Sequence, residues 1–515
     1  MSWSPSFGSP VTDTHLRSPG HVADVSGMCA ACTADCFGPC EIGLSALRGA
    51  EALLPFAADK NQFASEKRYP LDFSHFNING RVFGAVGLPE DPYEATYPHA
   101  DISSAFGVMH PVPVRAPFIL PAMAKLAWRE YFAGAALFGV PVVIGEDVVG
   151  KDPGLVVDGH RVVEAPLLAE MVGAFRRYQR GFGDIVLQAN FDDEYHGVLE
   201  YALARLGVTS VELKFGQAAK GIQGMGKVAR LEDALRFKAL GYIVLPDPTD
   251  PAVAEAHARG VGPEFEKIGK LPMWTPEVLK ARVAELRGLG AQRICFKTGP
   301  FDPRDIARIL EIASDAGVDL VTLDGAGGGT GHSPVKMMNE WGMPTVTLET
   351  LVWRLLSSWE KSGRPRPPVA MAGGFATEDQ VYKGLALGAP HVGTIALGRG
   401  AMAAASVGRQ VGEALRQGTV PKEYARFGST VEELFADFRV LRGVYGDDAS
   451  HIPPGALGVY SYLSRVSVGL QQLMALNRKF ALRHIDREDI VPLTELAAKV
   501  TGLPSYEERF PDVWP

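Results

Sequence analysis

Residues 293–334 read RICFKTGPFDPRDIARILEIASDAGVDLVTLDGAGGGTGHSP, and this stretch indicates the fold class most clearly. Two short apolar runs, Arg293–Lys297 and Leu320–Leu323, flank an amphipathic helical stretch, and each run ends in a glycine-bearing loop. This order is typical of a parallel sheet, in which a helix connects two neighbouring strands. We therefore expect the same unit to repeat along the chain.

The unit repeats from about residue 115 to residue 420. Nine runs fit a strand: Pro117–Pro121, Val142–Gly145, Ile185–Ala189, Ser210–Lys214, Tyr242–Pro246, Arg293–Lys297, Leu320–Leu323, Val369–Ala372 and Val392–Leu397. The Tyr242–Pro246 run lies in a long proline-rich connection, so we assign it to an insertion. The other eight predict an α/β fold, a (β/α)8 TIM barrel, in which functional groups gather where the strands end.

Three regions follow from this assignment. Residues 106–420 form the predicted barrel, residues 1–105 an N-terminal arm and residues 421–515 a helical C-terminal extension. The net charge of −8 argues against nucleic-acid binding and against a polybasic membrane anchor. The sequence shows no apolar run of membrane-spanning length and no secretory signal before the cysteines, so we expect a cytoplasmic protein.

Four of the five cysteines, Cys29, Cys32, Cys36 and Cys40, are crowded into the arm. The C-x2-C-x3-C-x3-C spacing lets four thiolates close around one compact inorganic centre. An iron–sulfur cluster of the 4Fe-4S type is the favoured occupant. Zinc is the alternative, although structural zinc usually joins two separated C-x2-C pairs, and disulfides fit such crowded thiols less well. The segment 36–42, CFGPCEI, resembles the cluster segment of carbon monoxide dehydrogenases.

Glycine-bearing turns follow the last two predicted strands. Gly373 and Gly374 follow one strand, Gly398 and Arg399 follow the next, and each turn leads into an expected helix. Two helix N-termini side by side would form a pocket for one phosphate, with Arg399 as a counter-charge. A phosphorylated cofactor such as FMN fits this arrangement. The alternative is that the glycines only cap helices.

The glycine run 325–331 exposes backbone N–H groups that a flat ring or an anion can approach closely. It fails the dinucleotide fingerprint, because Thr330 takes the place of the third glycine and Pro334 follows closely. We therefore expect electrons from a protein donor, such as a ferredoxin, and not from a nicotinamide.

Two lysines on different strands are candidate catalytic residues. Because side chains alternate along a strand, Lys214 and Lys297 would both point into the barrel mouth. A lysine beside the pyrimidine edge of a flavin stabilises the negative charge that builds there on reduction. The alternative is a buried lysine paired with a strand-end acid, such as Lys214 with Asp324 or Glu146. Downstream of the first lysine, a glycine-containing loop carries groups suited to a dicarboxylate, namely Gln217, Lys220 and Gln223.

Over roughly residues 110–505 the chain resembles the FMN-binding (synthase) domain of glutamate synthases, particularly the stand-alone archaeal-type versions. The resemblance rests on VVIGED at 142–147, ELKFGQAAKG at 212–221, DGAGGGTGHSP at 324–334, and AGGF at 372–375 through Gly398. It implies reduction by FMN of the imine that 2-oxoglutarate forms with ammonia or an amine.

The resemblance also implies roles for residues at matching positions. Lys214, Lys297 and Glu146 would be catalytic, and Lys220 would pair with a carboxylate of the oxo-acid. The implied cofactor contacts are Pro121, Ala122, Met123, Gln188, Lys214, Lys297, Asp324, Gly327, Gly328, Gly329, Gly373, Gly374, Gly398 and Arg399. The implied substrate contacts are Glu146, Gln217, Lys220 and Gln223.

Three departures from the family shape the expected partners. The cysteines precede the barrel instead of following it. The chain begins Met1-Ser2, without the N-terminal cysteine of the family's glutaminase domain, so nitrogen would come from an amidotransferase-type subunit or a free amine. The loop reads Lys220-Gly221 where the family has Lys-Pro, so a substituted amine could enter and the chain could be an N-methylglutamate synthase catalytic subunit. We also expect an oligomer with other synthase subunits.

Two rival classes stay open. A 2-hydroxy-acid oxidase-like FMN barrel would share the phosphate loops but needs a His–Arg pair, for which His332 and Arg354 are poor candidates. An electron-transfer subunit of a larger complex would keep the cysteines but would not need Lys214, Gln217 and Lys220.

Overall fold

The structure is a computed structural model. It describes residues 69–87, 92–123, 127–216, 226–326 and 340–514, together with the short pieces 6–9, 14–16, 63–64, 329–330 and residue 337. Some predicted site residues lie outside these ranges, and they are Cys29, Cys32, Cys36, Cys40, Gln217, Lys220, Gln223, Gly327 and Gly328. Their assignments remain predictions.

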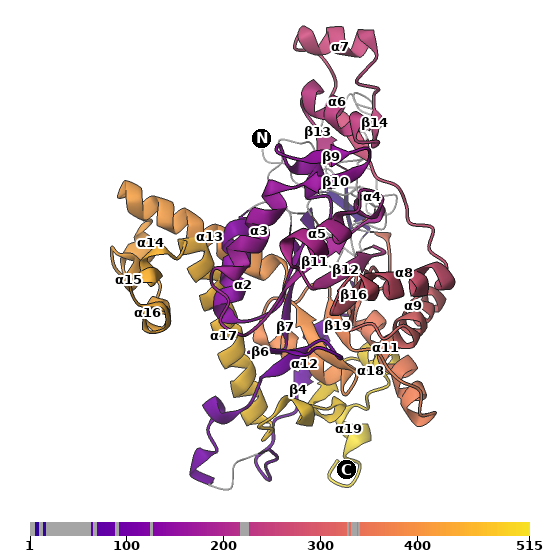
Figure 1. Cartoon of the computed structure of the whole chain (residues 1–515). Coiled ribbons are helices and arrows are strands. Elements are labelled where there is room, and N and C mark those ends of the chain that lie inside the picture. The colour runs from indigo at the N-terminus through magenta and orange to yellow at the C-terminus, as the bar shows by residue number, and fades with distance from the viewer. Residues whose placement is uncertain are drawn as a thin grey trace, which may run out of the picture.

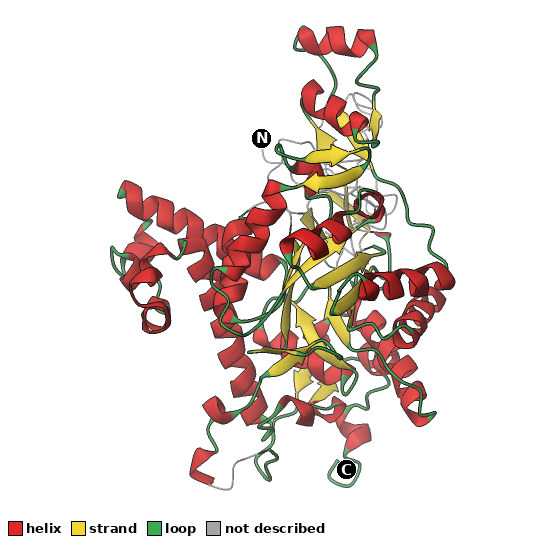
Figure 2. Ribbon diagram, viewed as in Figure 1, coloured by secondary structure: helices red, strands yellow, loops and turns green. Residues whose placement is uncertain are grey.

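Eight parallel strands form a closed barrel at the centre of the molecule (Figures 1 and 2). In order around the barrel they are β7 (Phe118–Met123), β8 (Val142–Ile144), β11 (Ile185–Ala189), β12 (Ser210–Lys214), β16 (Arg293–Thr298), β17 (Leu320–Asp324), β19 (Val369–Ala372) and β20 (Val392–Ala396). These are the eight runs chosen from the sequence, with small differences at the ends. The predicted eight-stranded α/β barrel is therefore confirmed.

Helices follow the strands and cover the outside of the barrel (Figure 2). In chain order they are α2 (Trp128–Phe138), α3 (Pro166–Arg176), α4 (Phe191–Tyr195), α5 (Val198–Leu206), α8 (Pro276–Gly288), α9 (Pro303–Asp315), α11 (Thr345–Lys361), α12 (Glu378–Gly388) and α13 (Arg399–Gln417). Within the described residues, no helix is both long and apolar enough to span a membrane.

The strand–helix–strand unit β16–α9–β17 shows why these residues form a helix between two parallel strands. Asp302 caps α9 by accepting a hydrogen bond from the backbone N–H of Arg304, and Pro303 occupies the first helical position. Ile306 and Leu310, one turn apart, are both fully buried against the barrel. Local capping and helical periodicity thus agree with the tertiary packing.

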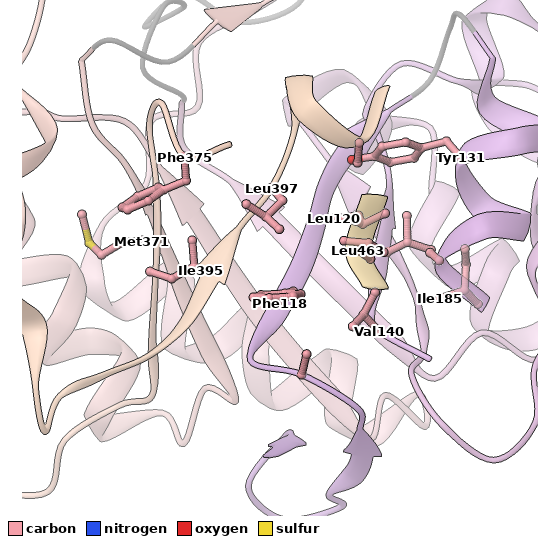
Figure 3. Packing of buried hydrophobic residues seen from close by; sticks show 14 of the residues in the cluster. Phe118, Leu120, Tyr131, Val140, Ile185, Met371, Phe375, Ile395, Leu397 and Leu463 are labelled. Carbon is pink, nitrogen blue, oxygen red and sulfur yellow. The ribbon is translucent and has the colours of Figure 1, made fainter. Parts of the chain in front are cut away.

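The main core lies between the barrel wall and the helices (Figure 3). Phe118 and Leu120 of β7 and Ile395 of β20 point outward into this layer, where Tyr131 of α2 also packs. Burial of such side chains stabilises the fold by roughly 1.5–3 kcal/mol each. A smaller core of alternate strand residues fills the barrel interior.

The inserted segment after β12 forms a separate antiparallel sheet, ordered β13 (Gly226–Val228), β15 (Phe265–Ile268), β14 (Ile243–Leu245). Two helices accompany it, α6 (Leu231–Ala239) and α7 (Pro251–Ala258). This insertion projects from the top of the molecule in Figure 1. Excluding the Tyr242–Pro246 run from the barrel was therefore correct.

The N-terminal arm and the C-terminal residues meet around the barrel. A hairpin of β5 (Ser104–Phe106) and β6 (Val112–Val114) contributes to the interior core. Strand β4 (Phe76–Ile78) pairs with β21 (Ile490–Pro492), and β3 (Phe63–Ala64) pairs with β18 (Gly329–Thr330) in the glycine run. The long helix α17 (Pro454–Leu476) packs against α13 and α2. Shorter helices complete this region, namely α14 (Lys422–Ala425), α15 (Val431–Leu434), α16 (Phe438–Tyr445), α18 (Glu495–Thr501) and α19 (Tyr506–Arg509).

Candidate active site at the barrel mouth

The C-terminal ends of the strands bring the two predicted lysines together. Lys214 of β12 and Lys297 of β16 are register partners, and Lys297 is in turn the partner of Thr322 on β17. Their side chains share the inward face with Cys295, which belongs to the interior core. Lys214 is only 3% exposed and Lys297 only 5%. The barrel mouth therefore holds two buried ammonium groups on adjacent strands.

Lys214 has a direct acidic partner. Its Nζ forms an ion pair with Glu146, which stands just after β8 and keeps part of its side chain accessible. This is the pairing that the sequence raised as the alternative to a lysine facing a flavin. Because the pair lies at the strand ends, where chemistry gathers in this fold, it can both stabilise charge and hold a proton.

Lys297 has a weaker acidic contact. Its Nζ lies 3.8 Å from Asp324 Oδ2, beyond hydrogen-bond distance. Behind both lysines lies the buried Glu212, whose Oε1 accepts a 2.5 Å hydrogen bond from Gln188 Nε2. Burial raises the pKa of Glu212 above its usual value, although Lys297, the Gln188 amide and Lys214 oppose that rise.

Two buried polar atoms inside the barrel mark a ligand position. Gln188 Oε1 and Thr322 Oγ1 have no hydrogen-bond partner among the described residues. Buried polar atoms nearly always have a hydrogen-bond partner, so each of these atoms calls for a partner that the described residues do not provide. A flavin pyrimidine ring carries both an N–H donor and carbonyl acceptors, and the neighbouring lysines suit its reduced, anionic form. The residues present therefore fit FMN.

The two glycine turns differ in how they meet their helices. A Cβ at Gly373, which has φ +117°, would lie 2.5 Å from Thr345 Oγ1 and 2.6 Å from the Gly325 carbonyl oxygen. The glycine is therefore required where the loops after β17 and β19 approach each other. Helix α13 begins directly at Arg399 with no side-chain cap and no acid in its first turn, which leaves its N–H groups for an anion.

Helix α12 departs from the expected open N-terminus. It begins at Glu378, beyond the Gly373-Gly374 turn, with the acids Glu378 and Asp379 in its first turn, and Thr377 and Gln380 form a capping box at its start. Helix α13 is therefore the better anion site of the two. A helix with its own side-chain cap has fewer donors left for a phosphate.

The remaining predicted residues lie along the same rim. Pro121, Ala122 and Met123 are the last three residues of β7 and are partly exposed. Gly374 has φ +105° and is exposed, as is Arg399, on which Asp324 acts electrostatically. The backbone of Gly329 pairs with Ala64 of the arm, which brings the segment following the cysteines to the glycine run.

Four further residues at the mouth escaped the sequence analysis, and they are Asp147, Asn190, Asp193 and Thr322. Asn190 and Asp193 follow β11 and cap α4 reciprocally, yet Asn190 Nδ2 and Asp193 Oδ1 have no partner among the described residues. Burial and the nearby Asp147 raise the pKa of Asp193 to about 8. Asp147, Asn190 and Asp193 stand just after predicted strands, and Thr322 stands within one, so these places could have revealed them.

Comparison with known proteins supports one assignment for part of the chain. Residues 270–410 match the conserved region in glutamate synthase. A glutamate synthase large subunit-like protein from Rhizobium meliloti (strain 1021) is 25% identical over 319 residues. That match covers 60% of this chain and 66% of the relative. Just over a third of the relative therefore lies outside the match.

Solved structures with a similar course of the chain have low identity. The flavin-binding domain of baker's yeast flavocytochrome b2 gives a TM-score of 0.46 at 14% identity, covering 86% of this chain and 82% of that one. A soluble mutant of (S)-mandelate dehydrogenase from Pseudomonas putida gives 0.43 at 14% identity, covering 82% and 88%. At these scores neither bears on the activity. Residues 270–410, which are similar to the conserved region in glutamate synthase, thus include four strands of the barrel, β16, β17, β19 and β20.

Proposed function

We propose that this chain is the FMN-binding catalytic unit of a glutamate-synthase-like oxidoreductase. Its substrates would be 2-oxoglutarate and ammonia or a small amine such as methylamine, and its product glutamate or N-methylglutamate. The observation that carries the proposal is the register pairing of Lys214 with Lys297 at the barrel mouth. The match of residues 270–410 to the conserved region in glutamate synthase supports the same chemistry.

The residues at the mouth divide the work of an imine reduction. Lys297 would supply positive charge where negative charge develops, and Gln188 Oε1 and Thr322 Oγ1 would hold the flavin ring. Bound FMN supplies the hydride that reduces the imine carbon. The Glu146–Lys214 pair, open to the mouth through Glu146, exchanges the protons of imine formation and reduction. Condensation releases one water, and reduction adds one hydride and one proton.

The proposal includes an iron–sulfur cluster on Cys29, Cys32, Cys36 and Cys40, supported by their spacing. Electrons would come from a ferredoxin-like protein, and nitrogen from an amidotransferase-type subunit or from free amine. Anaerobic purification of the full chain tests the cofactors. We expect a flavin spectrum together with a sulfur-to-iron charge-transfer band that Cys36→Ser abolishes. A colourless protein loaded with zinc would contradict both cofactor assignments.

Reoxidation of the reduced protein tests the reaction itself. We expect 2-oxoglutarate with ammonia or with methylamine to reoxidise the flavin, and neither component to do so alone. A 2-hydroxy-acid oxidase would instead be reduced by a hydroxy acid. Arg354, one of the two residues considered for that class, donates to the Val500 carbonyl on the outside of the barrel at 3.0 Å. Reduction by a hydroxy acid without any response to the oxo-acid would overturn the proposal.

A further inference from the structure

The insertion that follows β12 is attached to the barrel by charged contacts. Arg236 donates to the carbonyl oxygens of Gly150 and Asp152 at 2.6 and 2.7 Å. Lys270 donates to Asp192 from both its backbone N–H and its Nζ, each at 3.2 Å. These contacts fall on the segment that follows β8 and on α4, which follows β11, so the insertion is held to two segments at the barrel mouth.

The tightest of these contacts is made to Asp147. Lys267 of β15, 4% exposed, forms an ion pair with Asp147 Oδ2, while the Tyr242 hydroxyl donates to Asp147 Oδ1 at 2.9 Å. The Lys267 ammonium lies 4.0 Å from the centre of the Tyr242 ring and 4.9 Å from that of Phe237. An ammonium held between two rings and a carboxylate has little freedom to move.

Asp147 is also fixed through its backbone. Its N–H donates to Asp193 Oδ2 at 2.9 Å, and its φ of +67° lies in the left-handed region that few residues other than glycine adopt. Such a conformation persists only where the surroundings hold it in place. Here the carboxylate is held by the insertion and the N–H by Asp193 in the first turn of α4.

The neighbour of Asp147 in sequence is Glu146, the acidic partner of Lys214. A peptide unit fixed at Asp147 fixes the direction in which the Glu146 side chain leaves the turn. We propose that Asp147 is a positioning residue for the Glu146–Lys214 pair, and that the insertion sets it through Lys267 and Tyr242. This inference rests on the proposed function, because it assigns the pair a role in turnover.

We call the contacts of Lys267 and Tyr242 with Asp147 the clamp. A clamp with a structural role alone would stabilise the turn at Asp147 without affecting the reaction. The positioning role predicts more, because displacement of a reacting group by about 1 Å can cost about 100-fold in rate. Loss of the clamp should therefore lower kcat while leaving the affinity for the oxo-acid nearly unchanged. It should also alter the visible spectrum of the bound flavin, since Lys214 would lose its aligned partner.

The test compares the full-length holoprotein with three variants. Lys267→Met with Asp147→Asn in the same chain removes both charges, so that no unpaired charge stays buried and the protein still folds. Lys267→Arg keeps the charge and serves as the conservative rescue. Lys238→Met is the matched control, because Lys238 pairs with Asp247 at 2.5 Å and donates to Thr249 at 2.7 Å, both within the insertion.

Hydrogen exchange of a peptide covering residues 145–152, the flavin absorbance and steady-state kinetics are the three readouts. The double variant should exchange faster in that peptide and show an altered flavin spectrum. Its kcat should fall about 10- to 100-fold, with KM for 2-oxoglutarate within about 3-fold. Lys267→Arg should recover most of kcat, and Lys238→Met should match the parent.

The possible failures can be told apart. Unchanged exchange in the double variant would show that the clamp does not exist. Faster exchange with unchanged spectrum and kcat would show that the clamp is structural only, and would overturn the positioning role. If the parent flavoprotein does not turn over 2-oxoglutarate with any amine, the proposed function fails, and the exchange and spectral readouts still decide whether the insertion positions this turn.

Discussion

The two charged side chains of strand β16 that lie at opposite ends of the barrel differ in their contacts. At its start, Arg293 donates to Ser210 Oγ and to the His110 carbonyl at 2.7 Å, and it pairs with Asp184 at 2.9 Å. Near its end, on the same face, Lys297 Nζ lies 3.8 Å from Asp324 Oδ2, its nearest carboxylate oxygen among the described residues. Both side chains are about equally buried, at 4% and 5% exposed. At the closed end, Arg293 thus has several hydrogen-bond and ion-pair partners, whereas at the mouth Lys297 has few among the described residues.

The same contrast extends to the neighbouring polar groups. At the closed end, Asp319 accepts backbone hydrogen bonds from Val108 and Ile294, each at 2.8 Å. At the mouth, Gln188 and Thr322 each keep a buried oxygen without a partner among the described residues. Buried polar groups that stabilise a fold typically have all their hydrogen bonds made within the protein. Buried polar groups at a binding site typically leave some hydrogen bonds for the ligand.

The largest expected effect is on stability at the closed end. Arg293→Met should lower the free energy of unfolding by about 3–5 kcal/mol, because it removes the hydrogen bonds of a buried guanidinium and leaves the partly buried Asp184, 15% exposed, without its cation. Urea denaturation measures the change. Arg304→Met is the control, since the Arg304 side chain is 94% exposed and its loss should change stability by less than about 0.5 kcal/mol. Equal effects of the two substitutions would contradict the importance of the closed-end network.

Lys297→Met should act on catalysis instead. We expect turnover to fall by about 10²–10³, the range for removal of one electrostatic stabiliser, with a loss of stability below about 2 kcal/mol. Steady-state kinetics and urea denaturation of the same preparation separate the two effects. If Lys297→Met costs as much stability as Arg293→Met and leaves turnover intact, the two ends of the barrel do not differ as described.

The stability of the protein should depend on pH through Asp193 at the mouth. Burial and the nearby Asp147 raise the pKa of Asp193 from 3.8 to about 8, so between these values the folded protein keeps a proton that the unfolded chain releases. The stabilisation is fully present below about pH 4 and is lost as the pH rises through 8. The parent should therefore lose stability relative to Asp193→Asn by up to about 1.4 kcal/mol per pH unit over this window. Urea midpoints at pH 5, 6.5 and 8 measure the slope, and parallel curves would refute it.

The smallest expected effect concerns the buried hydroxyl of Thr322. Thr322→Val removes an oxygen that has no partner among the described residues, so the apoprotein should be as stable as the parent or more stable by up to about 1 kcal/mol. Flavin affinity should fall about 5-fold, which is about 1 kcal/mol. Thr350→Val is the matched control, because the Thr350 hydroxyl already donates to the Val346 carbonyl at 2.8 Å. Fluorescence titration of both apoproteins gives the affinities, and an unchanged value for Thr322→Val would remove this residue from the site.

The barrel could be predicted because its strands carry a strong local signal. Each wall strand is apolar on its outer face, and β16 and β12 also show the alternation that turns Lys297 and Lys214 inward. The ends of strands were less certain, since pairing with neighbours extends β7 to Met123 and stops β20 at Ala396. The cap of α12 was readable in the sequence as Thr377-x-x-Gln380 but was overlooked.

The clamp on Asp147 could not be predicted in this way. Its partner Lys267 lies 120 residues further along the chain, on the four-residue strand β15, directly after another charged residue, Glu266. Local periodicity carries no information about which loop such a lysine will contact. The positive φ of Asp147 depends on those distant contacts and leaves no local trace either.

The pairing of β4 with β21 has a consequence for synthesis of the protein. Phe76 is completely buried in the finished molecule, yet the strand that covers this part of the arm, Ile490–Pro492, is made about 400 residues later. At about 5–20 residues per second, the nascent arm waits roughly 20–80 s on the ribosome with its apolar surface uncovered. During that interval it is a natural target for a chaperone, and fast translation should favour a correctly closed chain.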